Sequence, residues 1–208
     1  MAQEKNCPAC GAQLSWKFQF AKQIVCEYCS SLLFLNDDTV SKAGMSAGLA
    51  ELPSLLNLYE YFKYDKKKYL PVGCVQYEYD LGFWNEWWCL TSSQQGVWIT
   101  VDEGSITIEE RIDLNEGVGS FDNYRVGQLC DLGKHGMMQV VEKKECTLVA
   151  ARGELPFKIK IGEQLKYIDL INQKGETFSM QFFSGNSFEL FQGQWIDPFK
   201  IEIKGANK

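Results

Sequence analysis

Two pairs of cysteines near the N-terminus have the clearest chemical meaning in this sequence. Cys7 and Cys10 form one CxxC pair, Cys26 and Cys29 form a second, and residues 11–25 separate them. Two thiolates three positions apart on a tight turn can point at one ion, and two such pairs at this spacing are typical of a four-cysteine zinc site. Four sulfur ligands leave no position open for water. We therefore predict one structural Zn²⁺ bound by Cys7, Cys10, Cys26 and Cys29.

Other chemistry for these cysteines is less favoured. A redox CxxC pair normally opens a helix within a larger fold, and nothing around these residues indicates one. A disulfide needs an oxidising compartment, but residues 1–6 lack the charged-then-apolar pattern of a secretory signal. No run approaches the roughly 20 apolar residues that span a bilayer. The expectation is a cytoplasmic protein without a membrane span.

A second group of candidates combines tryptophans with carboxylates. Trp84, Trp87 and Trp98 lie close together in the sequence, with Glu86 between the first two. If residues 84–91 form a strand, Trp84 and Glu86 share one face and Trp87 takes the other. The rings could be cross-strand core pairs. They could instead form a surface for a peptide, a base or an amine, because a cation over a tryptophan beside Glu86 suits a polyamine or a lysine.

Two further acidic residues, Glu154 and Asp169, could join Glu86 in acid–base chemistry if burial separated their pKa values. The simpler interpretation is a turn or strand residue that faces water. Catalysis by a Ser-His-Asp set is not indicated, because the sequence has a single histidine, His135, within a glycine-flanked turn. An enzyme therefore remains an alternative and not the first interpretation.

The charge balance argues against a nucleic-acid surface. The net charge is −6 and the sequence pI is about 5.0. Residues 1–35 carry three lysines against two glutamates, a net charge of +1. Release of counterions from phosphates would contribute little to such an association. A nucleic-acid-associated zinc ribbon is kept as a further alternative.

The elements that must position these residues are mainly β. After residue 55, short runs rich in aromatic and β-branched residues are separated by glycine- and aspartate-containing turns, which is typical of antiparallel meanders. We predict a zinc ribbon at 1–35, a linker of small residues at 36–52, and two small antiparallel β-meander units, barrel or sandwich-like, at 53–118 and 119–208.

Several blocks resemble a known family. They are residues 7–14, 72–79, 84–87, 153–156 and 167–170, of which Trp84-Asn85-Glu86-Trp87 and Gly153-Glu154-Leu155-Pro156 are the most specific. They are similar to bacterial proteins of domain-of-unknown-function family 4178. The strand Gly96-Val97-Trp98-Ile99 departs from the Gly-Trp-Leu type that these proteins tend to have. The resemblance implies no activity.

The functional expectation is therefore a non-catalytic zinc-ribbon module that binds another protein. Its candidate surface consists of Trp84, Glu86, Trp87, Trp98, Glu154 and Asp169. The alternative is an enzyme or a small-ligand binder, for example of a polyamine, with a carboxylate and aromatic site between the β units.

Overall fold

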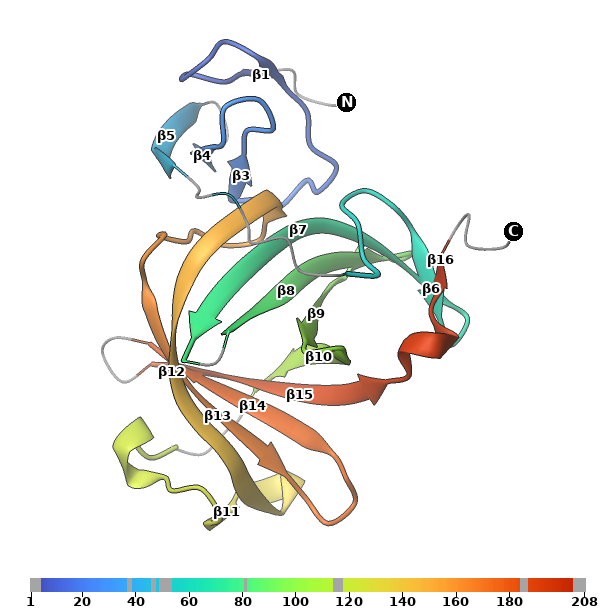
Figure 1. The fold of residues 1–208 in the computed structure, drawn as a ribbon, viewed down its shortest axis with the longest axis vertical. Coiled ribbons are helices and arrows are strands. Elements are labelled where there is room, and N and C mark those ends of the chain that lie inside the picture. The colour runs from blue at the N-terminus through green and yellow to red at the C-terminus, as the bar shows by residue number, and fades with distance from the viewer. Residues whose placement is uncertain are drawn as a thin grey trace.

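Eight antiparallel strands close into a barrel in this computed structural model (Figure 1). The structure describes residues 5–36, 39–45, 48, 54–80, 82–113, 118–183 and 187–203. The order around the barrel is β7, β8, β9, β10, β15, β14, β13 and β12, and β12 pairs again with β7. The barrel strands are β7 (Lys67–Tyr79), β8 (Gly82–Thr91), β9 (Gly96–Asp102), β10 (Ser105–Ile112), β12 (Met137–Leu155), β13 (Gln164–Ile171), β14 (Thr177–Phe182) and β15 (Phe188–Ile196).

The predicted mainly β fold with antiparallel meanders is confirmed. Strands β7 to β10 form one meander and β12 to β15 the other, and the pairings β10–β15 and β7–β12 join them into a single barrel. Turn chemistry fixes the local pairing. Glu103 and Gly104 both have positive φ angles and connect β9 to β10 in a two-residue turn. That geometry matches the twist of the flanking strands.

The inner face of the barrel carries carboxylates on several strands. In β13, Asp169 lines an interior cavity, whereas its neighbours Ile168 and Leu170 pack into an outer cluster. In β10, Glu109 lines the interior and Ile108 packs outside. Because alternate residues of a barrel strand point inward and outward, these three aliphatic residues are buried by an outer cover and not by the barrel lumen.

Short segments provide that cover. Residues 118–135 lie over the second meander and contain η1 (Phe121–Asn123), β11 (Leu129–Asp131) and η2 (Gly133–His135). Over the first meander lie residues 56–64 with β6 (Phe62–Tyr64), and the final strand β16 (Glu202–Ile203) after η3 (Pro198–Lys200). No helix in the described parts of the chain is long and apolar enough to cross a bilayer.

The cysteine-containing N-terminal segment sits at one end of the barrel (Figure 1). It contains β1 (Lys5–Asn6), β2 (Gln13–Leu14), β3 (Gln23–Val25), β4 (Ser31–Leu35) and β5 (Val40–Met45). Strand β5, which pairs with β4, lies within the segment 36–52, for which the sequence predicts a linker. Residues 37, 38, 46, 47 and 49–52 of that segment lie outside the described residues.

Strand β12 connects the barrel to this N-terminal segment. It pairs with β13, then with β7, and its last residues, Glu154 and Leu155, pair with β3. Two opposed glycines allow the close approach of β7 and β12 at this exit. A Cβ on Gly73 would lie 1.9 Å from the Glu154 carbonyl oxygen, and one on Gly153, whose φ is +70°, would lie 2.2 Å from the Val72 carbonyl oxygen.

Candidate functional site

The four N-terminal cysteines form a cluster that fits one metal ion. Their Sγ atoms all lie within 4.8 Å of one another. The Cys7–Cys29 and Cys10–Cys26 Sγ pairs are each 3.8 Å apart. A tetrahedron with metal–sulfur bonds of about 2.3 Å has an edge of about 3.8 Å. The donor set and spacing therefore suit a tetrahedral thiolate site, as the sequence predicts.

Tight turns bring the thiols together. The backbone N–H of Gly11 donates to the Cys7 carbonyl oxygen at 2.8 Å, and that of Ser30 donates to the Cys26 carbonyl oxygen at 2.9 Å. Gly11 and Ser30 both have positive φ angles, which turn the chain directly after each pair. The small residue that follows each CxxC pair therefore has a geometric role.

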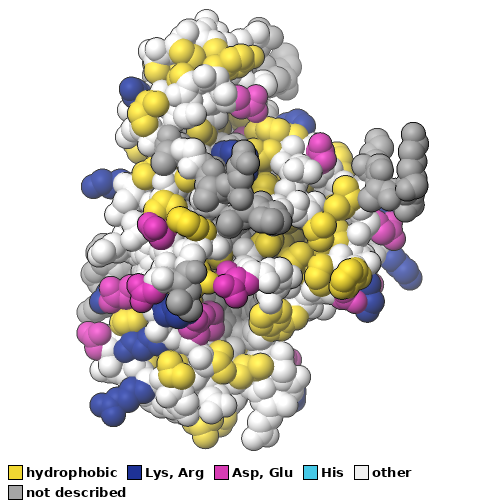
Figure 2. Space-filling view, in the orientation of Figure 1, with side chains coloured by type: hydrophobic (Ala, Val, Ile, Leu, Met, Phe, Trp, Pro, Cys, Tyr) yellow, Lys and Arg dark blue, Asp and Glu magenta, His cyan; other side chains and the backbone are white. Residues whose placement is uncertain are grey.

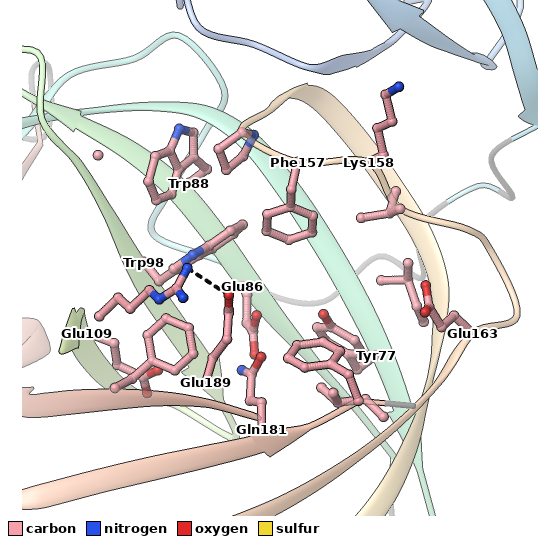
Figure 3. Close-up of a pocket in the computed structure, with 18 of the residues that line it drawn as sticks. Tyr77, Glu86, Trp88, Trp98, Glu109, Phe157, Lys158, Glu163, Gln181 and Glu189 are labelled. Carbon is pink, nitrogen blue, oxygen red and sulfur yellow. Dashed lines mark ion pairs between the residues drawn. The ribbon is translucent and has the colours of Figure 1, made fainter. Parts of the chain in front are cut away.

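A separate cavity of about 520 Å³ lies inside the barrel (Figure 3). This volume is within the range of small-molecule sites, and the mouths of β-barrels commonly hold such sites. Phe157 and Phe183 line the cavity and are 40% and 39% exposed, so the cavity reaches solvent beside them. Most of its remaining walls come from β7, β8, β9, β10, β13 and β15 and from the segment after β12.

Carboxylates from different strands meet at the bottom of this cavity. Glu86 of β8 and Glu109 of β10 line both the cavity and a narrower space of about 70 Å³ beside it. Asp102, Glu142 and Asp169 line that inner space from three further strands. We call the outer and inner spaces together the barrel cavity.

Burial makes these carboxylates hard to ionise. Desolvation raises the pKa of Glu86 to about 7, against the opposing hydrogen bond that Trp84 Nε1 donates to Glu86 Oε1 at 3.3 Å. Desolvation also raises the pKa of Asp169 to about 7 and the pKa of Glu109 well above its ordinary value. Among the described residues, no lysine or arginine forms an ion pair with any of the three. The charged form of each acid is therefore left without a cationic partner.

The two basic side chains that line the outer space do not supply that partner. Arg111 Nη1 forms an ion pair with Glu189 Oε1 at 2.8 Å, the dashed line in Figure 3. Lys158 extends away from the centre of the cavity, and its Nζ lies 4.9 Å from the centroid of the Phe34 ring in the N-terminal segment. The acidic groups at the bottom of the cavity therefore have no basic partner among the described residues of its wall.

Aromatic rings form one side of the cavity. The ring centroids of Trp88 and Trp98 are 5.0 Å apart, and those of Trp98 and Phe157 are 5.6 Å apart. Gly96 is needed for this arrangement, because a Cβ there would lie 1.7 Å from the Trp88 ring. The site therefore pairs aromatic faces with carboxylates, a combination that suits an organic cation.

The structure brings together some of the residues that the sequence singled out and separates others. Glu86, Asp169 and Trp84 line the inner space, and Trp98 lines the outer space beside Glu86. Trp87 packs on the opposite face of β8, with Cys74 and Cys89. Trp84, Trp87 and Trp98 are each less than a tenth exposed. They are core residues, so these three rings do not form an accessible surface for a partner.

Glu154 lies apart from the cavity carboxylates and is not solvent-facing. It is 1% exposed. Its carboxylate accepts hydrogen bonds from the backbone N–H groups of Lys17 at 2.9 Å and Phe18 at 2.6 Å. The interpretation of Glu154 as a water-facing residue at a strand exit is wrong, because the exit is covered by the N-terminal segment.

Sequence reasoning missed Glu109, Arg111 and Phe157. The first two alternate with Ile106 and Ile108 along β10, a pattern that reads as a half-exposed strand with its polar face in water. That Glu109 and Arg111 face inward becomes clear only when β10 is placed in a closed barrel with an outer cover. Phe157 follows the strand exit and carries no pattern of its own.

The described residues on the face drawn in Figure 2 form no concentrated patch of lysine and arginine. On the face drawn in Figure 2, the described lysine and arginine side chains lie scattered, and acidic side chains mix with hydrophobic ones across the barrel. This distribution does not favour a phosphate backbone as the partner.

Comparisons with known proteins identify a family but no function. The sequence model of the family described as "Domain of unknown function (DUF4178)" matches residues 60–198, which is more than half of the chain and includes every barrel strand. No curated protein and no solved structure matches the chain.

Proposed function

Because the chain belongs to the DUF4178 family, whose description leaves its function open, we propose a function from the chain's own residues. The barrel binds a small organic cation in its cavity, and the N-terminal cysteines hold a structural Zn²⁺. This function replaces a protein-binding surface at Trp84, Trp87 and Trp98 as the leading hypothesis, since those rings lie in the core.

The observation that carries the proposal is the placement of Glu86. Its side chain is 8% exposed, lines both parts of the barrel cavity, and has no basic ion-pair partner among the described residues. A buried, unpaired carboxylate costs stability. A positively charged ligand would remove that cost by supplying the missing partner.

The rest of the cavity indicates the shape of the ligand. Trp88, Trp98 and Phe157 offer ring faces and apolar contact area on one side, while Glu86 and Glu109 lie at the bottom. An ammonium group on an apolar or aromatic body satisfies both, with the charge held deep and the body against the rings. A primary or secondary amine is the simplest such chemistry.

Matched pairs of probes test this assignment by calorimetric titration of the zinc-loaded full chain. The first pair is 2-phenylethylamine and 2-phenylethanol, and the second is 1,6-diaminohexane and 1,6-hexanediol. We expect at least one amine to bind, at least about tenfold more tightly than its alcohol, because charge-assisted hydrogen bonds contribute roughly 1.5–3 kcal/mol. If alcohols and amines bind equally, or no amine binds, the cation-binding function is wrong.

Zinc is the metal that the cysteine cluster suits best. Four thiolates in a closed tetrahedral set are typical of structural zinc. Residues 5–35 form strands of only two to five residues, and so small a unit needs a clip to stay folded. In this proposal the metal stabilises the N-terminal segment and takes no part in ligand chemistry.

A further inference from the structure

We propose that the N-terminal metal ribbon, residues 5–35, forms the outer support of the barrel cavity, so that metal binding and ligand binding strengthen each other. The part of the cavity concerned is the rim segment, residues 156–163, which follows β12 and contributes Pro156, Phe157, Lys158 and Ile159 to the wall. The identity of the ligand rests on the proposed function, whereas the support itself does not.

Gln23 is the central contact between the two. Its side chain is fully buried and binds the main chain of Ile159 in both directions. The Ile159 N–H donates to Gln23 Oε1 at 2.6 Å, and Gln23 Nε2 donates to the Ile159 carbonyl oxygen at 3.3 Å. An amide side chain can thus act for the rim segment as a neighbouring strand would, since it satisfies one donor and one acceptor of the backbone.

Strand pairing reinforces this contact just before the rim segment begins. The N–H of Lys22 donates to the Leu155 carbonyl oxygen at 2.9 Å, and Ile24 pairs with Glu154. The buried Glu154 carboxylate accepts the Lys17 and Phe18 N–H groups. Ribbon residues therefore bind the end of β12 both at its backbone and at the side chain of Glu154.

A chain of aromatic contacts reaches the cavity by a second route. Phe18 of the ribbon lies 6.0 Å from Trp88, measured between ring centroids. Trp88 contacts Trp98, and Trp98 contacts Phe157 of the rim segment. The three latter rings all line the cavity. A displacement of Phe18 would therefore remove support from the wall that faces the carboxylates.

Metal binding affects these contacts because the ribbon residues that make them lie between the two cysteine pairs. Phe18 and Gln23 are in the connection from Cys10 to Cys26, and Cys26 directly follows β3. Cys7, Phe18 and Cys26 lie in one buried cluster, which also contains Leu70, Val72 and Leu90 of the barrel. Loss of the metal removes the clip that keeps this connection folded, and the rim segment then loses its partners.

Hydrogen–deuterium exchange of the full chain tests the support without any ligand. We compare the zinc-loaded protein, the protein after chelation, and the variant Gln23→Met, which has a similar length but lacks the amide. Gln13→Met, at an exposed position of the same ribbon, is the matched control. Amides of β13 and β14, which pair only with barrel strands, serve as the internal reference.

We expect exchange of the Ile159 amide, whose N–H donates to Gln23, to rise at least tenfold on chelation and in Gln23→Met, while zinc content stays at one equivalent in Gln23→Met and the reference amides are unchanged. Gln13→Met should match the wild type. Unchanged exchange of the Ile159 amide in a zinc-loaded Gln23→Met protein overturns the proposal. That arm decides the matter even if chelation unfolds the whole chain.

The coupling between metal binding and ligand binding is then measured with 2-phenylethylamine and 1,6-diaminohexane as probes. If either binds, Gln23→Met should weaken its affinity several-fold, and saturating amine should raise zinc affinity in competition with a chromophoric chelator, because coupling between two sites is reciprocal. An amine that binds without changing zinc affinity overturns the coupling. If no amine binds, the cation-binding function fails, and the exchange experiment still decides whether the ribbon supports the cavity.

Discussion

At the scale of single residues, Glu86 shows how a functional group can oppose stability. Burial raises its pKa from 4.5 to about 7. Between these values the folded protein holds a proton that the unfolded chain has released. The free energy of unfolding therefore falls as the pH rises from about 4.5 to about 7, and this loss is complete above that range. Asp169, whose pKa burial raises from 3.8 to about 7, acts in the same direction.

Replacing Glu86 by its neutral isostere should separate stability from binding. We expect Glu86→Gln to raise the melting temperature at pH 8, to reduce the fall in stability between pH 4.5 and pH 7, and to weaken amine binding at least about tenfold. Thermal melts over a pH series and calorimetric titration measure these effects. Glu78→Gln, on an exposed position of the neighbouring strand, is the control. A destabilised Glu86→Gln at pH 8 would contradict the assignment of an unpaired buried charge.

At the scale of strands, the sequence predicts which residues share a face better than it predicts which face points into the barrel. The alternation along β8 correctly places Trp84 and Glu86 on one face and Trp87 on the other, because a strand has a fixed period of two. The cysteine cluster follows from spacing alone. Which face points into the barrel does not follow, since Ile168 and Leu170 are buried by residues 118–135 and Asp169 faces the lumen. That result depends on contacts between distant segments.

The exit of β12 from the barrel gives a prediction for two glycines. Gly153 and Gly162 both have positive φ angles, +70° and +86°, but only at Gly153 would a Cβ meet other atoms. Gly162→Ala should cost about 1–2 kcal/mol from backbone strain alone. Gly153→Ala should cost clearly more, because the β7 backbone must also move. Urea unfolding of both variants measures the difference, and equal losses would show that the close approach to Val72 is not tight.

At the scale of the whole molecule, the ribbon and the barrel should differ in their dependence on metal. We expect the purified protein to hold one equivalent of zinc, and Cys10→Ser to lose it and unfold residues 5–35. Structural zinc contributes on the order of 10 kcal/mol to folding of such modules. The barrel should remain, because its eight strands pair among themselves. Metal analysis with amide exchange checks both parts.

Cys130→Ser, which changes a cysteine outside the cluster, is the control for that variant and should keep its zinc. If Cys10→Ser retains one equivalent of zinc, or if the wild-type protein contains none, the proposed metal site is wrong. If the barrel strands lose their amide protection together with the ribbon, the two parts fold as one unit.

The buried amide of Gln23 also has a consequence in time, during synthesis of the chain. Gln23 and Ile159 are 136 residues apart in the sequence. At a translation rate of about 5–20 residues per second, the ribbon is made roughly 7 to 27 seconds before the segment that completes it. Throughout that interval Lys17 and Phe18, whose N–H groups later donate to Glu154, have no completed barrel to contact. The nascent ribbon then has only its own short strands and the metal proposed for its cysteines. We therefore expect the yield of folded protein to depend on zinc supply during translation, and not only afterwards.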